Sequence, residues 1–509
     1  MNRTKKTTIN VIINMSSTIL TSIASFIMIR LVLDRMSSDY NGLNQTVAQL
    51  IFILTIFESS FTSAALIALY EPYIHKRKAQ INLICSTARY AFERSGGILF
   101  VGGILFAFIY SIFLKTDYNY FVVVLVFAIS IMSTVVSSLV ALKYRLLFQV
   151  TQTEYIVNFI NTLGNLLAHA TAYFYLLRNN NILHLRMIYT TVAIMITIVI
   201  AFLGKRRFPY VDFSLSPDFT TVKGTKDLIV SSSTGAIYKS VPFLFISSFA
   251  GTVQTSVYSV YSSIFGMVEN FSYAIFSAPR NGIGQMISEG NTEKIKMVFR
   301  EFEHLCFLVM SIMITIVGTL IIPFIKLYTS GVSDAQYVDY LISYSMIIAT
   351  FIQFIHMPSG QFISMSGHFK AVRDIQLLAA STLIVLDIIG VLILGVYGIL
   401  AANVLTGIML AILEVRYMRK KILHICYSSF FRLLIVYGGI TIMLIWGFTN
   451  LFMKSILNYF QLLYYGIFIS LLSVITFGGI GFVLFRLDMM ALVFRIKSLI
   501  GRSEKSHEC

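Results

Sequence analysis

The stretch LCFLVMSIMITIVGTLIIPFIKL, residues 305–327, contains one Lys and no Arg, Asp or Glu in 23 positions. A helix of about 20 apolar residues crosses the hydrocarbon core of a membrane. Similar runs fill the chain, and they predict fourteen membrane-spanning helices. We place these at residues 8–33, 43–69, 96–114, 120–142, 156–177, 183–203, 228–249, 256–278, 305–327, 340–361, 375–395, 398–413, 431–453 and 462–485. The chain is 57% hydrophobic and only 12% charged, which excludes a soluble globular protein. We therefore predict an all-α polytopic membrane protein.

Positive charge alternates across the predicted spans. Most of the 39 Lys and Arg residues lie in the termini and in every second connection. The largest clusters are at residues 75–78, 205–207, 416–421 and in the tail from 486 to 505. Because Lys and Arg are enriched in cytoplasmic loops, this pattern places both termini in the cytoplasm. We expect the clusters to meet anionic lipid headgroups, so the net charge of +16 does not indicate a nucleic-acid partner.

Signatures of enzymes and of metal sites are missing from the sequence. It has no glycine-rich phosphate loop, no HExxH and no Cys-x-x-Cys pair. The longest predicted external connection, residues 328–339, is too short for a catalytic domain. The four cysteines have no metal-binding spacing, and all lie near the cytoplasmic side, where thiols stay reduced. We predict a protein that is not an enzyme, with no catalytic residues, no metal site and no disulfide.

The spans divide into two halves. We assign residues 1–203 to an N-lobe of helices one to six, 204–226 to a cytoplasmic linker with Pro209 and Pro217, and 227–415 to a C-lobe of helices seven to twelve. Residues 416–509 hold helices thirteen and fourteen and a basic tail. Segments 80–94 and 292–303 follow the second helix of each half, and we expect each to form a short amphipathic helix lying flat on the inner leaflet. Matching halves are typical of transporters whose site lies between them near the membrane midplane.

Several short motifs carry a resemblance to a known family. They are IRLVL at 29–33, YNGL at 40–43, FESS at 57–60, FSAP at 276–279 and GVYGI at 395–399. With the fourteen-span layout, they make the chain resemble the polysaccharide flippases of the multidrug/oligosaccharidyl-lipid/polysaccharide exporter superfamily. One departure is at Ser59 and Ser60, where many relatives would carry a glycine.

The resemblance implies a fold and a function. Two six-helix lobes would alternate between inward-open and outward-open V shapes, with two C-terminal helices appended. The protein would move an undecaprenyl-pyrophosphate-linked oligosaccharide across the bacterial cytoplasmic membrane for surface polysaccharide biosynthesis. Its partners would be that lipid-linked substrate, the membrane lipids and other polysaccharide-assembly membrane proteins. Two alternatives stay open: a cation-coupled exporter of small organic molecules, as in the multidrug branch, and a polysaccharide polymerase or assembly scaffold.

Cations at membrane depth are candidates for binding the substrate, because a charge there is costly without a function. Lys239 lies near the middle of helix seven, with Ser232 on the same face, and it would attract a pyrophosphate or pair with a buried carboxylate. Arg30 lies near the outer end of helix one, whose Asn14 and Thr21 belong to a polar stripe. Arg30 would either face a water-filled lumen or extend to the outer headgroups.

Acidic residues inside the spans are candidates for a coupling ion or for neutralising these cations. They are Glu58, Glu269 and Asp387. The sodium-dependent relatives imply a cation site built by helices seven, eleven and twelve. No matching acid appears on helix seven, but Asn403 and Thr406 of helix twelve could add oxygen ligands to Asp387 of helix eleven. The coupling ion would be a proton or a sodium ion, and no other cofactor is expected. Two further titratable residues, His169 and His356, are expected to hydrogen-bond neighbouring helices.

Overall fold

The computed structural model describes residues 3–222, 225–277 and 292–492. Within these ranges every regular element is a helix, which confirms the all-α prediction. The chain forms two compact units: unit 1 is Met1–Val257 with Gly331–Ala335, and unit 2 is Tyr258–Ser330 with Gln336–Cys509. The lobe boundaries and the V shape stay predictions. Residues 278 and 279 of the FSAP motif and the tail beyond residue 492 lie outside the described residues.

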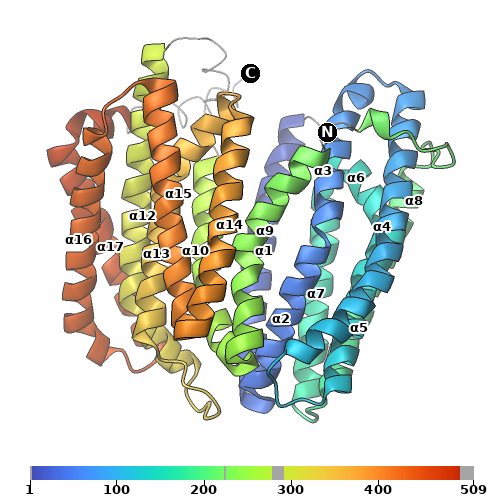
Figure 1. The fold of residues 1–509 in the computed structure, drawn as a ribbon, viewed down its shortest axis with the longest axis horizontal. Coiled ribbons are helices and arrows are strands. Elements are labelled where there is room, and N and C mark those ends of the chain that lie inside the picture. Colours follow the sequence, from blue (N-terminus) through green and yellow to red (C-terminus); the bar gives the residue numbers. More distant parts are fainter. Residues whose placement is uncertain (1–2, 223–224, 278–291, 493–509) are drawn as a thin grey trace. The chain divides into compact units, whose positions relative to one another are not determined.

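Unit 1 contains the helices of the first half of the chain (Figure 1). They are α1 (Arg3–Arg35), α2 (Ser38–Leu54), α3 (Ile56–Ile74), α4 (Lys78–Phe113), α5 (Tyr120–Val136), α6 (Leu142–Val150), α7 (Glu154–Leu176), α8 (Ile182–Arg207) and α9 (Thr225–Phe245). Two π-helical turns, Ser137–Ala141 and Ile246–Ala250, follow α5 and α9. Helix α9 packs against α2 and α3, so it belongs to unit 1 by its contacts.

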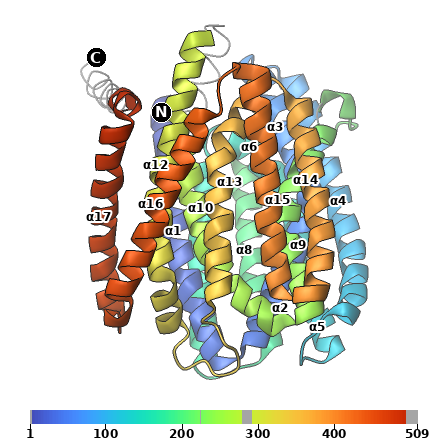
Figure 2. The same ribbon diagram turned by 60° about the vertical axis from the view of Figure 1, so that its left-hand side comes forward.

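Unit 2 contains the remaining helices. They are α10 (Thr252–Ser277), whose first residues belong to unit 1, α12 (Thr292–Tyr328), α13 (Tyr340–Met365), α14 (Phe369–Leu394), α15 (Val396–Tyr417), α16 (Ser428–Phe452) and α17 (Tyr459–Leu484). A π-helical turn, Met418–Leu423, extends α15. The last two helices, α16 and α17, both pack against α12 (Figure 2). Tyr437 of α16 and Phe477 of α17 stack on each other with ring centroids 5.9 Å apart.

The chain is a multi-pass membrane protein by the length and composition of its helices. Among the residues that the structure describes, ten helices are long and apolar enough to cross a membrane, and the bent pair of α2 and α3 would make an eleventh. That pair bends by 43° at Thr55, whose hydroxyl donates to the Phe52 carbonyl. Each of the fourteen segments predicted from the sequence overlaps a helix. The number of fourteen crossings stays a prediction.

The two amphipathic segments do not form separate helices, so this prediction was wrong. Residues 80–94 are the first turns of the 36-residue helix α4, and residues 292–303 are the first turns of the 37-residue helix α12. The apolar stripe of the first segment packs into the core of unit 1, where Ile81, Ile84 and Ala88 are buried. In the second segment, Phe299 and Phe302 pack against Phe362 of α13. Contacts with protein therefore replace the expected contacts with lipid.

The described part of the predicted linker, residues 208–222, folds back onto unit 1. Phe208 and Val222 join the same core as the start of α4. Thr87 accepts a hydrogen bond from the Asp218 amide at 2.9 Å. Hydrogen bonds from the Thr220 hydroxyl and amide lower the pKa of Asp218 below its ordinary value. This stretch is therefore held by specific contacts rather than free in solution.

Candidate functional site

Lys239 lies on an exposed strip of α9. Its ammonium group is 5.7 Å from the centroid of the Phe52 ring of α2, a cation–π distance. Gly235, one turn earlier, is also exposed and has open space where a Cβ would be, while Ser232 is half-buried. The neighbouring Ser240 is buried and donates to Gln49 of α2 at 2.8 Å. The hydrogen bond of Ser240 holds α9 against α2, while the side chain of Lys239 stays exposed.

The partner of Lys239 is an aromatic ring. Among the described residues Lys239 forms no ion pair, so the alternative of a buried carboxylate partner finds no support there. A cation that its own protein does not neutralise can attract an anionic ligand. This is the chemistry that a pyrophosphate group would require.

The polar stripe of α1 is shared with α7. Asn14 is exposed and accepts a hydrogen bond from the Asn158 amide of α7. Ser25 lies 3.4 Å from His169, whose other ring nitrogen is 3.0 Å from the Tyr189 hydroxyl. His169 therefore bonds neighbouring helices, as predicted. Thr21 is half-buried, and its hydroxyl donates to the Ser17 carbonyl of its own helix, 2.7 Å away.

Arg30 forms an ion pair that the sequence analysis did not consider. Its guanidinium is 2.8 Å from the carboxylate of Asp34, one turn later on α1. The side chains are 24% and 39% exposed, so the pair is partly open to its surroundings. The sequence offered Glu58, Glu269 and Asp387 as candidates for neutralising Arg30, and the structure adds Asp34 as its ion-pair partner. Residues four apart on a helix face each other, which explains the pairing.

Glu58 is buried at 6% exposure in the helix after the α2–α3 bend. Two serine hydroxyls donate to its Oε1: Ser95 of α4 at 3.1 Å and Ser138 of the π-helical turn at 2.5 Å. Hydrogen bonds of this kind stabilise a carboxylate away from water. The residue is thus a hydrogen-bonded centre that joins three segments of unit 1.

Arg186 is a further intramembrane cation, and the sequence analysis missed it. Its guanidinium donates to Asn44 of α2 at 2.7 Å and to the Ser130 hydroxyl of α5. Both partners are neutral, and no ion pair involves Arg186 in the part of the chain that the structure describes. Unit 1 therefore carries a second cation, on α8, without an anionic neighbour.

Asp39, at the start of α2, was also missed. Its buried carboxylate accepts from the Thr116 hydroxyl at 2.8 Å, the Asp117 amide at 3.0 Å and the Thr252 hydroxyl. Beside it, Asn41 donates to Ser256 at 2.8 Å. These bonds give the YNGL motif a structural role, because they join the start of α2 to the start of α10.

Asp387 of α14 is fully buried, and neither carboxylate oxygen has a hydrogen-bond partner in the described residues. Thr406 of α15 is also fully buried with an unpartnered hydroxyl. The two helices cross closely where Gly390 meets Gly398, since a Cβ on Gly398 would lie 2.0 Å from the Gly390 carbonyl oxygen. Unsatisfied buried oxygens are rare and need an explanation such as an ion or a proton. Carboxylate and hydroxyl oxygens suit a hard cation.

The remaining predicted residues of unit 2 have other surroundings. Asn403 of α15 is half-buried and donates to the Ile399 carbonyl at 3.0 Å. Glu269 of α10 is half-buried. His356 of α13 lies 2.8 Å from Glu414 of α15, and both are buried, which confirms its predicted bond to a neighbouring helix.

Each unit contains charged groups that no ion pair balances among the described residues. In unit 1, Lys239 and Arg186 are cations that suit an anionic ligand. In unit 2, the carboxyl group of Asp387 also lacks any hydrogen-bond partner, and it suits a proton or a metal cation. Cargo binding and ion binding are thus both within the chemistry of the chain.

No protein-family model and no curated protein sequence matches this chain. Its fold is similar to solved transporter structures. The lipid II flippase MurJ in an inward closed conformation has a TM-score of 0.71 and 12% identity, covering 93% of this chain and 99% of that one. An inward-facing multidrug resistance MATE family transporter of the MOP superfamily has a TM-score of 0.64 and 12% identity, and the match covers 81% of this chain and 96% of that one. An outward-facing MATE structure has a TM-score of 0.53 and 13% identity, and the match covers 82% of this chain and 96% of that one. These likenesses show a shared fold.

Proposed function

We propose that this protein is a flippase that moves an undecaprenyl-pyrophosphate-linked oligosaccharide from the inner to the outer leaflet of the bacterial cytoplasmic membrane. It would serve surface polysaccharide biosynthesis, together with other assembly proteins in that membrane. Both termini would lie in the cytoplasm. The protein would act as a transporter and not as an enzyme.

The observation that carries this proposal is the extent of the fold likeness. The flippase structure covers 93% of this chain, whereas the two multidrug transporters cover 81% and 82%. A fold that is shared almost from end to end favours a lipid-linked cargo over a small soluble one. The support is from architecture, because identity is 12%.

Lys239 supplies the chemistry for such a cargo. A lipid-linked pyrophosphate carries about two negative charges, and attraction to a cation strengthens as the local dielectric constant falls. Lys239 is exposed and has no carboxylate partner in the described residues. Arg186 would provide a second cation, while Arg30 is already balanced by Asp34. The polar residues Asn14, Thr21 and Ser232 would contact the sugar or its water.

Coupling to an ion would use unit 2. Asp387 offers two oxygen atoms without partners, and Thr406 offers a third on the adjacent helix. We propose that these residues, with Asn403, bind the coupling ion, which would be a proton or a sodium ion. Glu58 is less suited, because two serine hydroxyls already bond its carboxylate.

The test of the proposal is the substitution Lys239→Ala in a host that depends on this gene for its surface polysaccharide. The variant should still insert, but polysaccharide should be lost and the lipid-linked oligosaccharide should accumulate in the inner leaflet. The leaflet that holds the lipid-linked oligosaccharide can be determined in spheroplasts, because a membrane-impermeant glycan-binding protein binds only oligosaccharide in the outer leaflet. Lys326→Ala provides a matched control, because Lys326 is an exposed intramembrane lysine in unit 2. Normal polysaccharide in Lys239→Ala cells would remove Lys239 from the mechanism.

The multidrug exporter is the second candidate, favoured by the likeness to the MATE structures. It predicts that overexpression raises resistance to toxic organic cations, and that deletion leaves surface polysaccharide intact. A polymerase or scaffold is less favoured. The connection between α12 and α13, residues 329–339, is short, and its Asp334 accepts two hydrogen bonds from Ser38.

A further inference from the structure

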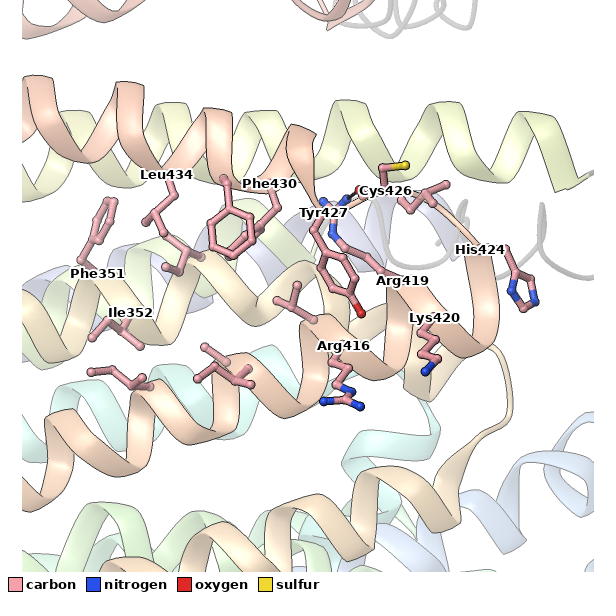
Figure 3. Close-up of a pocket in the computed structure, with 17 residues that line it drawn as sticks. Phe351, Ile352, Arg416, Arg419, Lys420, His424, Cys426, Tyr427, Phe430 and Leu434 are labelled. Carbon is pink, nitrogen blue, oxygen red and sulfur yellow. Dashed lines mark hydrogen bonds between the residues drawn. The ribbon is translucent and has the colours of Figure 1, made fainter.

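A groove of about 910 Å³ lies in unit 2 between α13, α15 and α16 (Figure 3). Its volume is typical of a site for an organic ligand of substantial size. One end is apolar, with Phe351 and Ile352 of α13 and Leu434 of α16. The other end is basic and contains Arg416, Arg419 and Lys420. The groove is therefore amphipathic along its length.

The apolar part faces outward from the helices. Ile408 and Ile412 of α15 are 40% and 59% exposed, and Phe431 of α16 is 53% exposed. All three line the groove. Because α15 and α16 are long and apolar enough to cross a membrane, these side chains meet acyl chains and not water. An occupant of this part must be a hydrocarbon.

The described residues leave two cations of the basic end without a counter-ion. Arg416 and Lys420 are exposed, and neither forms an ion pair with any residue that the structure describes. The third cation, Arg419, is fully buried and bonds both carboxylate oxygens of Glu303, so its charge is balanced. Two cations therefore stay available for an anionic group.

The backbone at this end has an unusual form. The π-helical turn Met418–Leu423 ends at His424, which has φ +51° and ψ +49° and lines the groove. A left-handed conformation is unfavourable in a residue other than glycine. Turns of the π type are frequent at functional sites because they change the direction of side chains. In this turn Arg419 is buried, whereas Lys420 reaches the groove.

We propose that this groove is a binding site for an anionic membrane phospholipid of the phosphatidylglycerol type. An acyl chain would lie along Ile408, Ile412 and Phe431, and the phosphate would contact Arg416 and Lys420. The predicted topology places residues 416–421 at the cytoplasmic surface, where anionic headgroups attract Lys and Arg. The site is distinct from the cargo residues proposed above, which lie in unit 1.

The test measures lipid binding by the purified full-length protein in detergent. Native mass spectrometry or a fluorescent-lipid titration would compare phosphatidylglycerol with phosphatidylcholine of identical acyl chains. We expect a clear preference for phosphatidylglycerol. The double variant Arg416→Ala, Lys420→Ala should lose roughly 30-fold in affinity, since each cation near the headgroups contributes about 1 kcal/mol.

Two further variants keep the test specific. Lys421→Ala is the matched control, because Lys421 is exposed and belongs to the same turn but does not line the groove. It should bind phosphatidylglycerol like the wild type. Ile412→Trp would add bulk to the groove at a side chain that is 59% exposed, without changing its charge, and it should weaken binding while the melting temperature stays near that of the wild type.

Three results would overturn the proposal. The first is equal affinity for the anionic and the zwitterionic lipid. The second is a loss of affinity for phosphatidylglycerol in Lys421→Ala that is as large as the loss in the double variant. The third is displacement of phosphatidylglycerol by undecaprenyl phosphate or inorganic phosphate at equal concentration, which would assign the groove to the polyprenyl cargo or to a free anion. Polysaccharide export is not the readout, so this result is independent of the flippase proposal.

Discussion

At the scale of single residues, Asp387 is the strongest case of a group that lacks a partner. Burying a carboxylate without hydrogen bonds is costly. We therefore expect Asp387→Asn to raise the melting temperature of the purified protein when no cation is added. If Asp387 binds sodium, added sodium should stabilise the wild type by mass action and leave Asp387→Asn unchanged.

The control for this prediction lies on the same helix. Asp374 of α14 is exposed and pairs with Arg373 at 3.0 Å, so Asp374→Asn should retain any response to sodium. A proton as the coupling ion predicts a different result, in which wild-type stability varies with pH and not with sodium. A wild type that responds to neither would contradict an ion site at Asp387.

Gly42 illustrates a residue whose role depends on close approach. A Cβ at this position would lie 1.7 Å from the Thr252 carbonyl oxygen, so the backbone of α2 or α10 would have to move. We expect Gly42→Ala to destabilise the protein by about 1–3 kcal/mol, the usual cost of overpacking. Thermal unfolding in detergent measures this loss.

Gly97 of α4 provides the comparison, because a Cβ there would meet nothing within 4 Å. Gly97→Ala should be neutral or slightly stabilising, since alanine favours a helix. Equal destabilisation by both substitutions would show that the contact at Thr252 is not the cause.

The sequence identified some of the site residues and missed others for a physical reason. Lys239 and Asp387 are visible because each interrupts a long apolar run. Asp39 and Arg186 lie near the ends of their spans, where charges are ordinary. Their importance comes from partners such as Thr116, which is 77 positions away from Asp39. Hydropathy along the chain contains no information about such partners.

At the scale of elements, the π-helical turns place polar groups where a regular helix would not. The turn at 137–141 carries Ser138, which bonds Glu58. The turn at 246–250 carries Ser247, whose hydroxyl is 2.8 Å from that of Tyr110. The turn at 418–423 carries the buried Arg419. Apolar periodicity predicts helices, but it does not predict where a π-helical turn shifts the register of the side chains. The contacts of Ser138, Ser247 and Arg419 could therefore not be predicted from the sequence.

The pair of Arg419 and Glu303 connects three elements of unit 2. Arg419 also donates to the Cys426 carbonyl at 2.6 Å and to Ser429 at 3.0 Å, so it joins α12, the π-helical turn and the start of α16. Removing one partner leaves a buried charge without compensation, at a cost of about 3–5 kcal/mol. We expect Arg419→Met and Glu303→Leu each to lower thermal stability strongly.

The double variant is the informative measurement for this pair. Arg419→Met with Glu303→Leu removes both charges, and it should be more stable than either single variant. A double variant whose loss equals the sum of the two single losses would show that the charges do not interact energetically. The double-mutant cycle, followed by thermal unfolding, distinguishes these results.

At the scale of the whole molecule, hydropathy predicted where the long helices lie but not all of their contacts. The fourteen predicted segments all overlap helices, because apolar length is a property of the local sequence. Helix α9, predicted as the first helix of the C-lobe, packs against α2 and α3 of the N-terminal half, while the lobe boundary itself stays a prediction. Its sequence is as apolar as its neighbours and does not specify which helix it contacts.

Sidedness is the whole-molecule property that a direct measurement can test. The distribution of Lys and Arg predicts that the connection of residues 329–339 lies outside the cell and that residues 416–427 lie inside it. We expect Ser333→Cys, in a background with Cys426→Ser and Cys509→Ser, to react with a membrane-impermeant maleimide on intact cells. Cys85 and Cys306 are buried, so they should not react with the maleimide.

The native exposed thiol provides the opposite measurement. With only Cys509 replaced, Cys426 should react after permeabilisation and not before, because it lies beside the basic segment that the charge pattern assigns to the cytoplasm. Labelling of Cys426 on intact cells, with Ser333→Cys protected, would reverse the orientation of every helix. It would also move the proposed phospholipid groove to the outer leaflet, where residues 416–420 would no longer meet the cytoplasmic anionic headgroups.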